Sequence, residues 1–144
     1  RQVGLNGYRA EIERTFFIGK PSDKQMDVYR VMTEAQQTML DGIRPGMTAG
    51  EADALGRKVI QKAGLGQYSN HRCGHGIGLG LHEEPYLRFD NELVLQEGMA
   101  FSIEPGIYIP ELGGFRHSDT VILTKDGSRK ITSYKHELED LILE

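Results

Sequence analysis

The chain has 144 residues, a length typical of one domain that buries a substantial core. Apolar residues of the AVILMFWYC set make up 38%, and the 18 glycines bring this share to about half of the chain. Such a composition is globular and excludes a disordered or fibrous class. The net charge of −4 gives no basic footprint for nucleic acid, and no apolar run approaches the roughly 20 residues of a membrane span. We therefore expect neither a nucleic-acid partner nor a membrane. The single cysteine, Cys73, cannot form an internal disulfide, which favours a cytoplasmic location.

The first segment, residues 8–18, mixes apolar and charged side chains and ends in Phe16-Phe17-Ile18, which predicts a strand. On a strand, Glu11 and Glu13 would point to one face and Arg14 to the other. The chain opens with Arg1 rather than Met and leads almost at once into this segment. We therefore expect residues 1–144 to be a fragment of a longer chain that begins inside a sheet.

Two amphipathic helices are predicted next, at about residues 22–44 and 48–64. The first follows Pro21-Ser22-Asp23 and is stopped by Arg44-Pro45-Gly46. The second begins with a capping box, in which Thr48 and Glu51 each satisfy a free backbone amide. Each helix repeats apolar residues at steps of three or four, so each has one face suited to packing on a sheet.

After residue 66 the helical spacing of apolar residues ends and several strands are predicted. Two helices followed by several strands indicate an α+β fold. Residues 71–85 are rich in glycine and histidine and suggest irregular or short-strand structure. Strands are predicted at residues 99–103, 107–109, 120–124, 131–132 and 141–143, with a tight turn at 125–127. We expect both helices on one side of an antiparallel sheet built from strands near 8–18, 100–109 and 119–124. The other face would carry the functional site.

The strongest chemical signal is a segment in which three histidines, His71, His75 and His82, alternate with glycines. Imidazole can bind a metal ion, carry protons near neutral pH or donate to a developing oxyanion. Glycines let the backbone approach a ligand closely. The alternative is a solvated loop whose histidines only form hydrogen bonds, but three histidines in this setting favour a site.

Two further segments place polar groups next to apolar strands. Glu104 is expected inside an apolar strand that covers residues 101–108, and a buried carboxylate is costly unless it is paired or binds a metal ion. Residues 114–121 lead from Arg116 through Asp119 into an apolar strand, which is typical of a site at a strand end. An exposed edge strand and a surface turn are the corresponding structural alternatives.

Together these segments resemble the pita-bread metallopeptidase family, which includes Xaa-Pro dipeptidase, Xaa-Pro aminopeptidase, methionine aminopeptidase and the metal-free creatine amidinohydrolase. Four motifs appear in the family's order: residues 7–16, 75–83, 103–108 and 114–121. The resemblance implies a curved antiparallel sheet with helices on one face, here mainly the second half of the catalytic domain. It also implies a homodimer for the full-length protein.

The family holds two divalent ions with two aspartates, one histidine and two glutamates. Carried over by motif, the metal ligands in this chain would be Glu11, His75 and Glu104, with Glu11 standing where the family has aspartate. The other aspartate would lie before Arg1. His71 and His82 would contact the substrate and its tetrahedral intermediate, Glu104 would also carry protons, and Arg116 would bind substrate.

Ser118 falls where the family has the glutamate that bridges the two ions. A serine hydroxyl is a weak ligand, so we expect at most one tightly bound Mn, Co or Zn ion. Three hypotheses follow: an Xaa-Pro-type peptidase with an altered metal site, a metal-independent hydrolase of creatinase type, and a non-catalytic peptide-binding member. The first, acting on a small peptide or amide, is our leading hypothesis. Glu13 in the Glu13-Arg14-Thr15 triplet favours the second.

Overall fold

The computed structural model describes residues 2–144. The elements in chain order are β1 (Gln2–Leu5), β2 (Tyr8–Glu11), β3 (Phe17–Ile18), α1 (Asp23–Gly42), α2 (Ala49–Lys62), the short 3₁₀ helix η1 (Gly66–Tyr68), β4 (Gly74–Gly76), β5 (Glu83–Leu87), β6 (Ala100–Ile103), β7 (Gly106–Ile109), β8 (Gly113–Arg116), β9 (Asp119–Thr124), β10 (Gly127–Lys130), the 3₁₀ helix η2 (Leu138–Leu141) and β11 (Ile142–Leu143).

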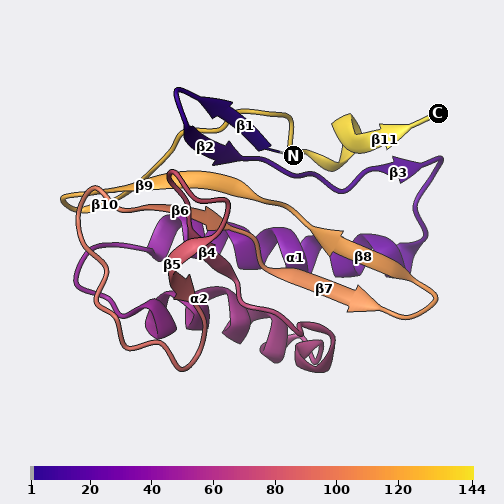
Figure 1. Ribbon diagram of the computed structural model, residues 1–144. Coiled ribbons are helices and arrows are strands. Elements are labelled where there is room, and N and C mark those ends of the chain that lie inside the picture. The colour runs from indigo at the N-terminus through magenta and orange to yellow at the C-terminus, as the bar shows by residue number, and fades with distance from the viewer. Residues whose placement is uncertain (1) are drawn as a thin grey trace.

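Both predicted helices form, and both begin with a capping box. Ser22 caps α1 together with Gln25, and Thr48 caps α2 together with Glu51, as the sequence indicated for the second helix. Neither helix combines the length and apolar character that crossing a bilayer would require. Their apolar faces pack on the same side of the main sheet (Figure 1).

The main sheet has five antiparallel strands in the order β10-β9-β6-β4-β5. The buried residues Phe101 and Val121 of this sheet join the core beneath α1 and α2. His75, Ser102 and Thr120 are directly paired across β4, β6 and β9, so they share the opposite face. The helices therefore cover one face of the sheet, and His75 lies on the other.

Three expectations about the strands were wrong in detail. Segment 8–18 is not one strand of the main sheet. It divides into β2 and β3, with an isolated bridge from Glu13 to Ser118, and β2 pairs with β1. Beside β9, the Thr120 hydroxyl occupies the place of a backbone partner, because it donates to Glu11 O and accepts from Glu11 N.

Residues 100–109 form two strands, as predicted for 99–103 and 107–109, but the two strands do not lie in one sheet. β6 ends at Ile103, so Glu104 lies just beyond the strand rather than inside it, and β7 leaves the main sheet to pair with β8. Pro105 has no backbone N–H to continue a ladder. The last strand of the sheet, β10, covers residues 127–130 rather than 131–132.

The glycine- and histidine-rich segment was expected to be irregular or to form short strands, and it forms the short strands β4 and β5, with β4 at an inner position of the main sheet. Gly74 is required there, because a Cβ atom at this position would lie 2.2 Å from the carbonyl oxygen of Ser102. Glycine thus allows the close strand approach that places His75 on the site face.

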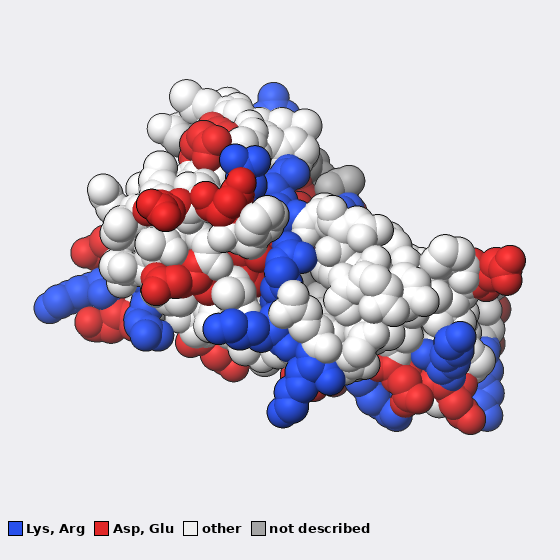
Figure 2. Space-filling view, turned by 90° about the horizontal axis from the view of Figure 1, so that it is seen from below, with Lys and Arg blue, Asp and Glu red and all other residues white. Residues whose placement is uncertain are grey.

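Figure 2 shows the molecule from below the view of Figure 1. Acidic and basic side chains both occur on this face, beside a broad region of uncharged residues.

Candidate metal and catalytic centre

The site face brings together residues from three distant segments. His75 Nε2 lies 3.8 Å from Glu11 Oε2 and 3.5 Å from Glu104 Oε1. All three residues are buried. The predicted ligand residues Glu11, His75 and Glu104 therefore lie together, although they come from β2, β4 and the turn after β6.

His75 has the protonation pattern of a metal ligand. Its Nδ1 lies 2.9 Å from the carbonyl oxygen of Gly76, a contact that requires a proton on Nδ1 and leaves a lone pair on Nε2. Burial lowers the pKa of His75 to about 4, so the ring is neutral at pH 7. Among residues 2–144, no hydrogen-bond partner satisfies the buried Nε2. This nitrogen can accept an ion at little electrostatic cost.

His82 lies beside these groups. Its ring packs edge-on against His75, with centroids 4.1 Å apart, and ligand atoms of Glu11, His75 and His82 lie within 4.8 Å of one another. His82 is exposed, whereas the other two are buried. The position suits a group that meets a substrate at the mouth of the site.

Ser118 lies opposite Glu13 and two residues before Thr120, whose hydroxyl binds the backbone of Glu11. Ser118 is buried, its backbone exchanges two 3.0 Å hydrogen bonds with Glu13, and no partner for its hydroxyl occurs in the described part of the chain. A hydroxyl carries no charge at pH 7 and cannot offset the repulsion between two neighbouring divalent ions. The carboxylates and the free Nε2 lone pair of this centre fit a divalent ion, whereas Ser118 adds no charged ligand.

His71 is held by two contacts at the edge of the site. Its Nδ1 lies 2.5 Å from Arg72 O, so Nε2 accepts the 2.8 Å hydrogen bond from the hydroxyl of Tyr108. Burial lowers the pKa of His71 and raises that of Tyr108, which keeps both groups neutral. No sequence pattern predicted a role for Tyr108, although Tyr108 lies within the motif at residues 103–108.

Arg116 lies next to this pair. It binds Glu13 through Nε and Nη2, at 2.5 and 3.0 Å, and this hydrogen bonding raises the pKa of Arg116. Glu11 and Glu13 therefore have different partners: His75 lies near the first, and Arg116 binds the second. Arg14 instead forms a buried ion pair with Asp119.

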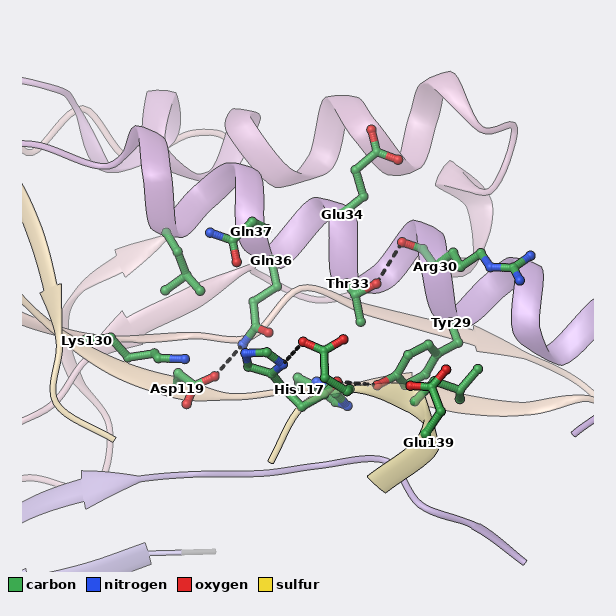
Figure 3. A pocket seen from close by; sticks show the side chains of 14 residues that line it. Tyr29, Arg30, Thr33, Glu34, Gln36, Gln37, His117, Asp119, Lys130 and Glu139 are labelled. Carbon is green, nitrogen blue, oxygen red and sulfur yellow. Dashed lines mark hydrogen bonds and ion pairs between the residues drawn. The ribbon is translucent and has the colours of Figure 1, made fainter. Parts of the chain in front are cut away.

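A separate pocket lies on the helix side of the sheet, between α1 and residues 136–139 (Figure 3). His117 lines it and packs edge-on against Tyr29 of α1, with ring centroids 5.3 Å apart. Strand alternation explains this orientation, because His117 lies between Arg116 and Ser118. His117 therefore lines this pocket rather than the centre around His75.

Comparison with known proteins supports the motif assignment. The sequence profile described as Metallopeptidase family M24 matches residues 2–125. The Xaa-Pro dipeptidase of Lactobacillus delbrueckii subsp. lactis is 49% identical over 135 residues, and that of Pyrococcus horikoshii is 45% identical over 131. These matches cover 94% and 91% of this chain but only 37% of either relative.

Solved structures give the same result. The prolidase from Pyrococcus furiosus superposes with a TM-score of 0.92 at 43% identity, covering 94% of this chain and 40% of that one. The X-Pro aminopeptidase from Thermotoga maritima superposes with a TM-score of 0.93 at 33% identity, covering 99% and 39%.

Proposed function

Because this chain belongs to metallopeptidase family M24, we propose that it carries the site of an Xaa-Pro-type hydrolase. The reaction would cleave a C–N bond on the N-terminal side of proline. The chain has the pita-bread fold of the prolidases that it matches. The observation that carries the proposal is the convergence of His75, Glu11 and Glu104 on one buried point. We further propose that residues 1–144 are the C-terminal part of the catalytic domain and are inactive alone.

Glu11, His75 and Glu104 would hold one divalent ion, Mn, Co or Zn, through two carboxylates and the Nε2 lone pair. When bound there, such an ion supplies Lewis-acid polarisation of a carbonyl oxygen. Glu104 has the position to exchange a proton with the reacting groups. Ser118 in place of a bridging carboxylate limits the site to one tightly bound ion.

His71, His82 and Arg116 would position the substrate. His82 lies exposed beside His75 and can donate a hydrogen bond to the oxygen on which negative charge develops. His71 would reach the substrate by exchanging its bond from Tyr108 for one to the ligand. We propose a small peptide or amide as the substrate, and a homodimer for the full-length protein.

A second candidate is a metal-independent C–N hydrolase of creatinase type. The specific observation in its favour is the pairing of Glu13 with Arg116 beside a site whose bridging position is Ser118. In this reaction His75 and Glu104 would transfer protons without an ion.

Metal content separates the two candidates. The full-length protein would be purified without chelators, analysed for bound transition metals, and assayed before and after EDTA treatment on Xaa-Pro dipeptides, with either a free carboxylate or a carboxamide on proline, and on creatine-like amides. Metal-dependent dipeptide cleavage supports the first proposal. Unchanged activity on creatine-like amides without metal supports the second, and inactivity on both would indicate a binding protein.

A further inference from the structure

Glu13 and Arg116 form an ion pair, and hydrogen bonds to the backbone of each residue hold the pair in place. Glu13 exchanges backbone hydrogen bonds with Ser118, and the Thr15 hydroxyl bonds both the N–H and the carbonyl of Arg116, at 3.0 and 3.1 Å. These contacts fix the two side chains against each other. The bidentate geometry uses the guanidinium fork that would otherwise bind a carboxylate of a ligand.

The pair is accessible and borders the site. Its side chains are 24% and 21% exposed, for Glu13 and Arg116 respectively, and both line a pocket with Tyr108 and Gly114. Tyr108 in turn binds His71. A ligand that contacts the substrate-positioning residues can therefore also contact the ion pair.

A ligand with a free carboxylate meets two obstacles here. It must take the Arg116 fork from Glu13, and it then places its own negative charge beside the displaced Glu13 carboxylate. A neutral carboxamide meets neither obstacle. Its carbonyl oxygen accepts from the guanidinium while its NH₂ group donates to the carboxylate, so the ion pair stays intact.

We infer that the Glu13–Arg116 pair determines specificity by selecting against a free carboxylate and for a neutral carboxamide at this end of the site. The inference rests on the proposed function, because it assumes that substrate occupies the pocket beside His71. It narrows the substrate class from dipeptides in general to peptides or amides whose group at this position is uncharged.

The test uses three ligands of the full-length protein that undergo no Xaa-Pro cleavage: L-proline, L-prolinamide and L-proline methyl ester. The amide and the ester carry the same charge, but only the amide has an NH₂ donor. Calorimetry should give at least about tenfold tighter binding for prolinamide than for proline, with the ester in between. Equal or tighter binding of proline, or no binding of any of the three, would overturn the inference.

Glu13→Gln removes the charge at nearly constant size and frees the guanidinium fork. Its affinity for proline should rise and the preference for prolinamide should fall about tenfold, whereas Glu34→Gln, at an exposed position on α1, should leave both unchanged. An unchanged preference in Glu13→Gln would contradict the proposal. The parent protein's own preference provides a test that needs no variant. Because these ligands are not cleaved, absence of Xaa-Pro hydrolysis would count against the proposed function alone.

Discussion

Arg57 binds the carboxylate of Asp53, one turn earlier on α2, through both Nε and Nη2, at 2.5 and 2.8 Å. The same guanidinium donates to the carbonyl of His71 at 2.9 Å, and Asp53 Oδ1 accepts the backbone N–H of Cys73 at 3.0 Å. Asp53 is fully buried. The pair therefore holds the segment that leads into β4, and so the position of His75, against α2.

Replacing Arg57 with Met should keep the packing of the side-chain stem but leave the buried Asp53 carboxylate without its counter-ion. The expected loss is about 3 kcal/mol in the free energy of unfolding, measured with urea on the full-length protein. The double variant Arg57→Met/Asp53→Asn should regain part of this loss, since the Asn oxygen still accepts from Cys73. A single variant within about 0.5 kcal/mol of the parent would show that the ion pair contributes little.

The sequence predicted what depends on local pattern. Helix boundaries fell within two residues of α1 and α2, because capping boxes and apolar spacing are encoded within each helix. The motif resemblance correctly grouped Glu11, His75 and Glu104. The position of β4 and the contacts of Arg57 and Tyr108 were not predicted, because each depends on partners far away in the chain. Glycine has a low strand propensity, so this segment predicted only irregular or short-strand structure, although the glycines of β4 are needed for tertiary packing.

Gly74 offers a direct test of that packing. Gly74→Ala should destabilise the protein by about 1–3 kcal/mol, because the new Cβ meets the Ser102 carbonyl oxygen at 2.2 Å and Leu87 Cδ1 at 2.9 Å. Gly127→Ala is the matched control, since a Cβ at that position has no described neighbour within 4 Å. Thermal unfolding of the two variants would be compared. Equal melting temperatures would mean that β4 and β6 can separate without cost.

His117 should contribute to the acid sensitivity of the fold. Burial lowers its pKa from 6.5 to about 4, so between these values the unfolded state binds more protons than the folded state. Its contribution to stability is complete above about pH 6.5 and is lost as the pH falls toward 4. His117→Phe keeps a ring against Tyr29 but cannot titrate. Urea unfolding at pH 7 and pH 5 should show a smaller loss in the variant; an identical loss would exclude His117 as a contributor.

His75→Ala should abolish activity and metal binding in the full-length protein while costing at most about 2 kcal/mol of stability. The change removes the buried Nε2, for which no hydrogen-bond partner is described. Removing an unsatisfied polar atom is favourable and offsets part of the stability lost with the packing of the ring. Ser102→Ala, directly opposite on β6, is the control and should keep full activity. Both variants would be followed by urea unfolding and calorimetric titration with Mn²⁺. A large loss of stability in His75→Ala, with activity retained per folded molecule, would make His75 a structural residue.

Ser118→Glu should restore the carboxylate that the site lacks. A carboxylate at this buried position would face the ion held by Glu11, His75 and Glu104. The affinity for Mn²⁺ should therefore rise at least about tenfold in a calorimetric titration of the full-length protein. Ser118→Gln is the matched control, because it adds the same bulk without the charge and should leave the affinity close to that of the parent.

The two Ser118 variants should also differ in stability, and the difference should change when metal is added. In EDTA, Ser118→Glu should unfold at a lower temperature than Ser118→Gln, because its buried carboxylate has no cation to neutralise it. With Mn²⁺ at about 100 times the dissociation constant of the Glu variant, binding should add about 2.7 kcal/mol to that variant but only about 1.4 kcal/mol to a tenfold weaker Gln variant, so Ser118→Glu should gain about 1.3 kcal/mol relative to Ser118→Gln. Two tightly bound ions in the unmodified protein, or equal Mn²⁺ affinities in the Glu and Gln variants, would show that Ser118 does not limit the metal site.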